Sequence, residues 1–147
     1  MLDILCARGH SYMVPRHGGR GHQMSYTVHP VWTKPLAVIC DGRCSSNSEI
    51  FAHAVKTLRR GVVVGQTTGG RVIGTNNRPL LDFGDLRDAE IGWFLPDGTD
   101  MEGHGVVPDI PVDITPADEV RGSDPQLDAA IMVLSRQIAE QKENKSK

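Results

Sequence analysis

The sequence has few cysteines, few aromatic residues and no strong excess of charge of either sign. Its 147 residues include three cysteines, too few for the disulfide framework of a small secreted domain. The formal net charge of −2 provides no electrostatic attraction to nucleic acid or to an anionic membrane surface. No apolar run approaches the roughly 20 residues that a helix needs to cross a bilayer. We therefore expect no nucleic-acid partner and no membrane insertion.

Metal and cofactor sites are not indicated either. Cys40 and Cys44 have a spacing that could begin a metal site, but no second Cys/His pair follows at a suitable distance. Residues 9–30 are rich in glycine, arginine and proline, and we expect an exposed loop there. Its histidines fit no common ligand spacing: His10, His17, His22 and His29. The glycine-rich segment 65–74 lacks the pattern of a phosphate-binding loop, so the sequence predicts no metal and no cofactor.

Apolar residues in the middle of the chain predict a βαβ unit. The continuous apolar run at residues 36–40 is typical of a parallel strand buried on both faces. A helix over residues 46–58 follows, and a second apolar strand occupies residues 62–64. Gly61 suits the C-cap of that helix. The apolar face of the helix is predicted to comprise Ile50, Phe51, Ala54, Val55 and Leu58.

The flanking segments complete one expected domain over residues 1–147. Residues 1–8 have the pattern of the last turns of a helix, with Leu2, Leu5 and Ile4 facing inward. Residues 80–102 alternate short β segments with turn signals, which predicts a smaller antiparallel part.

A final helix should begin at Ser123 or Asp124, with Pro125 in its first turn. Its predicted apolar stripe comprises Leu127, Ala130, Ile131, Leu134 and Ile138. We expect residues 1–30 to form a partial helix and loop, residues 31–140 the core, and residues 141–147 a frayed tail.

The serine at the start of the central helix is a candidate nucleophile. The apolar strand runs into a small polar turn, and Ser46 lies where the helix begins. Unpaired N–H groups at a helix N-terminus can stabilise negative charge on an oxygen, as in an oxyanion hole. A structural interpretation competes with this one. Ser46 and Glu49 form the Ser-x-x-Glu pattern of a capping box, and most such boxes only start helices.

Four blocks over residues 34–134 carry a family resemblance. In chain order they are KPLAVICDGRCSSNSEIFAHAVKTL, VVVGQTTGG, WFLPDGTDMEGHGVVPDIPV and DPQLDAAIMVL. Together they resemble the catalytic domain of the tail-specific (C-terminal processing) serine peptidases, and above all its tricorn-protease-like branch. The resemblance implies an α/β fold of ClpP/crotonase-like ββα units, with a parallel core sheet and a smaller antiparallel β part.

The resemblance also implies the site residues. Ser46 occupies the nucleophile position, with its neighbour Ser45 as the second choice. The N–H of Asn47 would donate to the oxyanion, and Glu102 matches the glutamate of a Ser–His–Ser–Glu tetrad. One branch of the family instead activates its serine with a lysine, but this chain has Arg71 in that loop, and arginine keeps its proton.

The histidine and second serine of the tetrad lie upstream of the matching region in the family. The chain is therefore expected to be the C-terminal portion of a serine peptidase catalytic domain. A local histidine could replace the missing base, and His104, two residues from Glu102, is the second-choice candidate. His53, seven positions along the helix from Ser46, is a weaker one. For both histidines a structural role is the main alternative.

Two functions follow. The first is a serine-type endopeptidase that hydrolyses peptide bonds in peptides, unfolded proteins or protein C-termini. The alternative is a non-catalytic module of the same fold that binds peptides or apolar ligands. Self-association into a homo-oligomer is also expected, because an isolated portion would expose apolar surface. The compartment stays open, with free cysteines favouring the cytoplasm over the periplasm or secretion.

Overall fold

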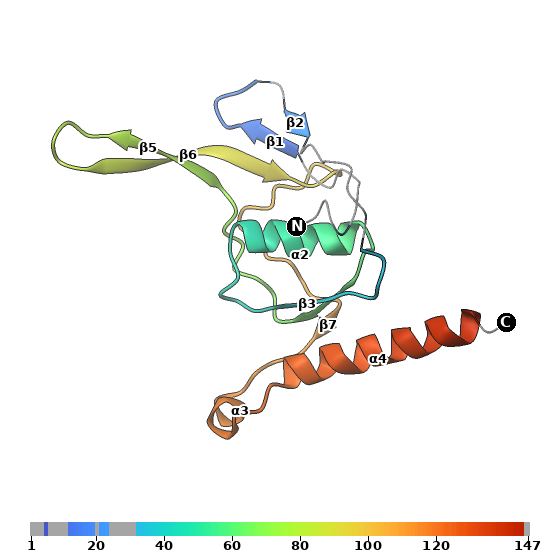
Figure 1. The fold of residues 1–147 in the computed structure, drawn as a ribbon. Coiled ribbons are helices and arrows are strands. Elements are labelled where there is room, and N and C mark those ends of the chain that lie inside the picture. Colours follow the sequence, from blue (N-terminus) through green and yellow to red (C-terminus); the bar gives the residue numbers. More distant parts are fainter. Residues whose placement is uncertain (1–4, 6–11, 20, 24–31, 146–147) are drawn as a thin grey trace.

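The computed structural model describes residue 5 and residues 12–19, 21–23 and 32–145 (Figure 1). A parallel sheet has the strand order β3-β4-β7, and an antiparallel sheet has the order β2-β1-β6-β5. The parallel strands are β3 (Ala37–Cys40), β4 (Val62–Gly65) and β7 (Ile110–Pro111). The antiparallel strands are β1 (Tyr12–Pro15), β2 (His22–Gln23), β5 (Gly74–Pro79) and β6 (Asp85–Phe94). The helices are α2 (Asn47–Thr57), α3 (Pro116–Arg121) and α4 (Pro125–Lys145).

The parallel sheet lies between two helices. Both α2 and α4 pack on β3 and β4, and Figure 1 shows them on opposite faces. Val63 and Val64 of the central strand β4 are fully buried, as a continuous apolar run predicts. The predicted βαβ unit is confirmed, since β3 and β4 are parallel neighbours joined by α2. However, within the described part of the chain β3 is an edge strand, and Ile39 remains 39% exposed.

Helix α2 connects two hydrophobic clusters. Val55 packs with Cys40 and Val63 against the parallel sheet. Ile50 packs with Val72 and Met101, and Trp93 and Leu95 lie against that group. The predicted apolar face of α2 is therefore divided between the two sheets. The first turn of α2 lies between the parallel and the antiparallel sheet.

The antiparallel sheet begins earlier in the chain than expected. Within residues 9–30, the predicted loop, the structure contains β1 and β2, so that prediction is wrong. β1 pairs with β6 by backbone hydrogen bonds, and Tyr12 stacks on Phe94 with ring centroids 6.1 Å apart. This pairing joins segments some 80 residues apart, and no local pattern signals it. The segment expected to hold several short strands instead contains one long strand, β6, whose hairpin with β5 projects from the body (Figure 1).

The predicted helix over residues 1–8 lies outside the described residues apart from Leu5, which is helical and buried. The end of α2 also differs from the prediction. Leu58, and not Gly61, is its C-cap, and the next residue, Arg59, has a positive φ of 49°. Gly61 is needed for another reason, because a Cβ atom there would lie 2.5 Å from the carbonyl oxygen of Leu36.

The C-terminal region agrees with the sequence in part. Helix α4 begins where predicted, with Asp124 Oδ1 accepting the N–H of Leu127 at 2.9 Å, but it continues to Lys145, so residues 141–145 are helical and not frayed. The short helix α3 was not predicted. Of the expected stripe, Ala130 is buried and Leu134 half-buried. The rest of the stripe is exposed, contrary to prediction: Leu127, Ile131 and Ile138.

Helix α4 also contacts the rest of the protein through a buried polar residue. Gln126 is 3% exposed, and its side-chain amide donates to the carbonyl of Val112 at 2.9 Å. This bond fastens α4 to the segment after β7. Among the described residues, no helix is both long enough and apolar enough to span a membrane.

Candidate active site

Ser46 has an unusual backbone conformation. Its φ of 56° and ψ of −125° match the first central position of a type II′ turn, a position that glycine dominates. A serine in that conformation carries strain of roughly 1–3 kcal/mol. The turn is sharp because β3 ends at Cys40 and α2 starts at Asn47, leaving six residues to reverse the chain. Ser46 is exposed at the tip of this turn.

The hydroxyl of Ser46 does not cap the helix. It makes no capping hydrogen bond, although the Ser-x-x-Glu pattern is present. The two residues nonetheless have the reciprocal arrangement of a capping box, and Glu49 Oε2 accepts the N–H of Ser46 at 3.1 Å. The same N–H lies 2.7 Å from the carbonyl oxygen of Arg71. The backbone of Ser46 is therefore held, and its hydroxyl proton has no acceptor among the described residues.

Glu49 is a fully buried carboxylate at 0% exposure. Oε1 accepts the Thr68 hydroxyl at 2.5 Å and the Gly70 N–H at 2.6 Å. Oε2 accepts the Arg71 N–H at 2.8 Å in addition to that of Ser46. A buried charge is tolerated when such donors surround it. The sequence indicated Glu49 only as a capping residue, so this buried role was not predicted.

The signal for Glu49 was available in the helical pattern. Glu49 lies one turn before Ala52, which is 1% exposed, so both residues are on the buried face of α2. A carboxylate on a buried face requires compensating donors. Thr68, also missed, supplies one of them, and its hydroxyl further accepts the N–H of Val106 at 2.8 Å.

The two neighbours of Ser46 differ in whether their backbone groups are hydrogen-bonded. The N–H of Asn47, the first residue of α2, has no acceptor within the part of the chain that the structure describes, so it can donate to a ligand. Ser45 is engaged by Ser48, whose hydroxyl accepts the Ser45 N–H at 3.0 Å and donates to the Ser45 carbonyl at 2.7 Å. The structure therefore places the exposed Ser46, whose hydroxyl proton has no acceptor among the described residues, beside the free N–H of Asn47.

Glu102 binds the other side of the glycine-rich loop. Its Oε2 accepts the N–H groups of Val72 and Ile73 at 2.7 and 2.8 Å. The peptide between Arg71 and Val72 thus bonds Ser46 through its oxygen and Glu102 through its nitrogen. Since these two atoms point in opposite directions in a trans peptide, Glu102 Oε2 lies roughly 8 Å from the Ser46 nitrogen. Direct contact between that carboxylate oxygen and the Ser46 nitrogen is excluded, because the Arg71–Val72 peptide lies between them.

The two candidate histidines do not bond to Ser46. His104 is exposed, and its Nδ1 lies 3.1 Å from the carbonyl oxygen of Glu102. His53 Nδ1 lies 2.8 Å from the Thr57 hydroxyl, about 10 Å along α2 from Ser46. Burial, and then the neighbouring Lys56, lower the pKa of His53, so it is neutral at pH 7. The structure favours a structural role for His53.

The turn that contains Gly103 and Gly105 packs against the glycine-rich loop. Gly103 N–H donates to the carbonyl of Gly70 at 2.8 Å, and a Cβ atom on Gly105 would lie 2.1 Å from the carbonyl oxygen of Thr68. The segment that contains Glu102 therefore lies directly on the loop that contacts Ser46.

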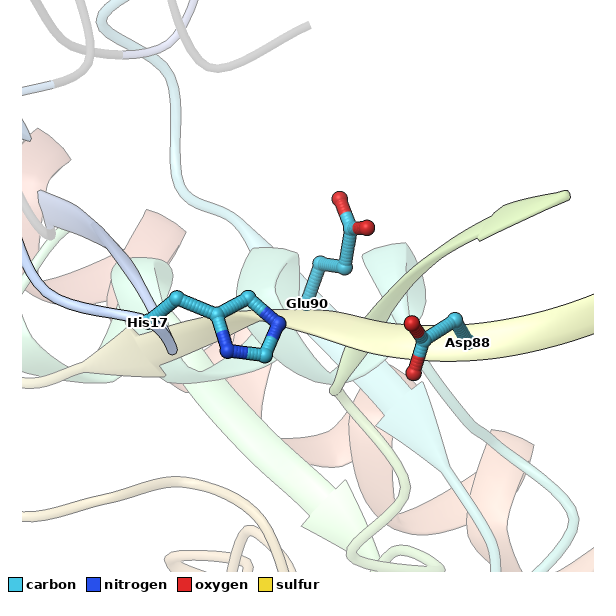
Figure 2. A group of neighbouring side chains, drawn as sticks. All are labelled: His17, Asp88 and Glu90. Carbon is cyan, nitrogen blue, oxygen red and sulfur yellow. The ribbon is translucent and has the colours of Figure 1, made fainter. Parts of the chain in front are cut away.

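The structure also brings together His17, Asp88 and Glu90, whose potential ligand atoms lie within 4.8 Å of one another (Figure 2). Arg78 already pairs with both carboxylates, at 3.1 Å to Asp88 and 2.8 Å to Glu90. Hydrogen bonds from Arg78 and Asn76 lower the pKa of Glu90. A metal ion would have to displace the guanidinium, so we interpret this group as an ion-pair network on the antiparallel sheet.

The cysteine pair likewise has ordinary partners. Cys40 Sγ donates to the carbonyl of Gln66 at 3.2 Å, and the Asp41 N–H lies 3.4 Å from Cys44 Sγ. Burial raises the pKa of Cys40 to about 11, so it stays a thiol at neutral pH. Metal binding would require the thiolate.

Comparison with known proteins identifies the family. Residues 4–112 match the sequence profile of peptidase family S41. The chain belongs to peptidase family S41. The tricorn protease of Thermoplasma acidophilum is 34% identical over 140 residues, covering 94% of this chain and 13% of that protein. The carboxy-terminal-processing protease of Bartonella bacilliformis is 33% identical over 91 residues, covering 62% of this chain and 21% of that one.

A solved structure agrees with these relatives. The crystal structure of the tricorn protease is 28% identical and superposes with a TM-score of 0.73, covering 94% of this chain and 13% of that chain. The resemblance to tail-specific and tricorn-like peptidases is thus confirmed. This S41 chain spans less than a quarter of the length of the curated relatives described above.

Replacement of Ser46 by glycine should stabilise the protein. Glycine adopts positive φ without steric cost, whereas Ser46→Ala retains the strain. We expect Ser46→Gly to exceed Ser46→Ala in free energy of unfolding by about 1 kcal/mol. Urea unfolding measures the difference, and equal stability of the two variants would show that the turn is unstrained.

Glu49→Gln should be strongly destabilising. The amide replaces one acceptor oxygen with a donor that faces backbone N–H groups, leaving buried donors unpaired. We expect a loss of about 3 kcal/mol by urea unfolding, with faster hydrogen exchange in residues 68–71. The control is Glu140→Gln, which removes an exposed ion pair with Arg136 and should cost no more than about 0.5 kcal/mol. Similar costs for both variants would contradict the role of Glu49.

Proposed function

We propose that this chain carries the nucleophile and oxyanion donor of a serine-type endopeptidase. The observation that supports this proposal best is the turn at Ser46, where a strained backbone presents the exposed Ser46 side chain beside the free N–H of Asn47. Strained residues held by surrounding hydrogen bonds cluster at active sites. Membership of family S41 supports the same reaction class.

The proposed reaction is acyl transfer. Ser46 Oγ attacks the carbonyl carbon of the scissile peptide bond while a base removes the hydroxyl proton. The carbonyl oxygen becomes an oxyanion, and the Asn47 N–H donates a hydrogen bond to it. The C–N bond then breaks, the protonated base gives its proton to the departing amine, and water hydrolyses the acyl-enzyme.

We assign the base to a histidine outside these 147 residues, with His104 as the second choice. Glu102 would orient that base through an intervening hydroxyl, as in the tetrad of the tricorn-like branch. The separation of roughly 8 Å between Glu102 Oε2 and the Ser46 nitrogen supports an indirect role. Glu102 also braces the loop through the backbone of Val72 and Ile73.

We further propose that residues 1–147 are one C-terminal portion of an S41 catalytic domain with the ClpP/crotonase-like arrangement of ββα units. The coverage of relatives supports the first point, and the α2-covered parallel sheet supports the second. Substrates would be peptides, unfolded proteins or protein C-termini. Exposed apolar side chains on α4, including Ile131 and Met132, support association into a homo-oligomer.

The alternative function is a peptide-binding or apolar-ligand-binding module of the same fold. It is favoured by one observation, that no basic side chain among the described residues hydrogen-bonds to Ser46 Oγ. The two functions differ in their reaction with a serine-directed covalent probe, because a binding module would not acylate or phosphonylate.

Labelling by a fluorophosphonate tests the nucleophile. We expect labelling once the segment that supplies the base is joined to the chain, and its complete loss in Ser46→Ala, because only the activated hydroxyl reacts. Intact-mass spectrometry gives the measurement. The matched control is Ser45→Ala, which should still label. Labelling that survives Ser46→Ala, or peptide binding by the joined protein without any labelling, would reject the proposed nucleophile.

Glu102→Gln tests the second carboxylate in the same joined protein. The amide oxygen can still accept from Val72 and Ile73, so binding and fold should be nearly intact, whereas the loss of charge weakens the base. We expect kcat to fall about 100-fold or more with KM changed less than about threefold. Glu119→Gln, on the exposed surface of α3, should leave both constants unchanged. An unaltered kcat in Glu102→Gln would remove Glu102 from the mechanism.

A further inference from the structure

Arg71 has a positive charge that the rest of the described chain does not neutralise. Within residues 12–19 and 32–145, the arginine side chains pair with carboxylates or donate to oxygen atoms, with two exceptions, Arg59 and Arg71. Arg59 follows the C-terminal end of α2, where a cation is favourable. Arg71 lies at the opposite end, beside the N-terminus of the same helix, where a cation is unfavourable.

The backbone of Arg71 is fixed on both sides. Its carbonyl oxygen accepts the Ser46 N–H at 2.7 Å, and its own N–H donates to Glu49 Oε2 at 2.8 Å. Residue 71 therefore cannot move away from the Ser46 turn without breaking the network around Glu49. The carboxylate of Glu49 is saturated by its backbone and hydroxyl donors, and it forms no ion pair with the Arg71 guanidinium.

The side chain of Arg71 lies over Gly69. A Cβ atom on Gly69 would come 2.9 Å from Nη2 and 3.2 Å from Nε of Arg71, so the missing side chain makes room for the guanidinium. The same Cβ atom would lie 3.1 Å from the carbonyl oxygen of Cys44, and the Gly69 N–H donates to that oxygen at 2.9 Å. Cys44 directly precedes the Ser45–Ser46 turn. The guanidinium thus lies over the loop that bonds to the Ser45–Ser46 turn.

The chemistry of the guanidinium limits the roles that Arg71 can have in the site. Arginine does not lose its proton, so Arg71 cannot be the base, and it has no acceptor atom. Its planar set of N–H donors matches a carboxylate, which it can bind with two parallel hydrogen bonds. The exposed position of Arg71 leaves those donors open to a ligand.

We propose that Arg71 determines substrate specificity by binding a carboxylate of the peptide held at Ser46. This proposal rests on the proposed function, because it needs a peptide in the site. The carboxylate belongs either to an acidic side chain near the scissile bond or to the C-terminus of the peptide. Both sources offer the same two oxygens to the guanidinium, and the experiment separates them.

Binding of four matched peptides tests the proposal without requiring turnover. The peptides share one sequence and differ in having Glu or Gln at the central position and a free acid or an amide at the C-terminus. Their dissociation constants are measured by fluorescence anisotropy with the 147-residue chain carrying Ser46→Ala. We expect the peptide that lacks the recognised carboxylate to bind about tenfold more weakly. A Glu-to-Gln effect identifies a side chain, and an acid-to-amide effect identifies the C-terminus.

The variants decide whether Arg71 is responsible. Arg71→Gln, combined with Ser46→Ala, should abolish the preference for the peptide that has the recognised carboxylate. Arg71→Lys should retain part of this preference, because lysine keeps the positive charge but lacks the planar set of donors. Arg59→Gln is the matched control, an equally unpaired arginine roughly 17 Å away along α2, and it should keep the full preference. The unfolding midpoint should not change in Arg71→Gln, since the guanidinium makes no bond within the described chain.

Three results would contradict the proposed role of Arg71. An undiminished preference in Arg71→Gln, an equal affinity for all four peptides, or no binding of any of them would overturn the role of Arg71. Carboxylate-dependent binding together with a Ser46 that never labels would instead support Arg71 and reject the peptidase proposal.

Discussion

The buried carboxylate of Glu49 is the interaction on which the site depends. Ser46, Thr68, Gly70 and Arg71 all donate to it, so a single side chain joins the turn before α2 to the loop after β4. A charge at 0% exposure is stable only with such donors in place. Loss of any part of the loop geometry would leave this charge undersolvated. The same bonds offset the strain that Ser46 carries at positive φ.

Glu49 and Glu102 therefore bond to different parts of the same loop. Glu49 holds the turn from beneath, while Glu102 binds the far side of the loop through Val72 and Ile73. The peptide between Arg71 and Val72 lies between Glu102 Oε2 and the Ser46 nitrogen and bonds to both. Much of the site is backbone, and its glycines either adopt positive φ, at 70 and 103, or allow close approach, at 69 and 105. A Cβ atom at 105, for example, would collide with the carbonyl of Thr68.

The surroundings of the turn are suited to negative charge. The free N–H of Asn47 lies at the N-terminus of α2, and the unpaired guanidinium of Arg71 lies over Gly69 in the loop that packs against this turn. By contrast, the carboxylates of Asp88 and Glu90 on the antiparallel sheet are already neutralised by Arg78. A depression of about 490 Å³ lined by Lys34, Lys56 and Arg59 lies at the amino ends of β3 and β4, away from Ser46.

The sequence by itself determined the βαβ unit, the start of α4 and the family, because continuous apolar runs, Asx caps and ordered motif blocks are local signals. It also pointed to Ser46, Asn47 and Glu102 as site candidates. Only the tertiary structure decided that β1 pairs with β6, that Gln126 and not the full stripe of α4 is buried, and that Glu49 is enclosed by donors. Those outcomes depend on groups distant in sequence, since strand partners and the donors around a buried charge come from other segments. The same reason hid the position of Arg71 until the loop was folded against the turn.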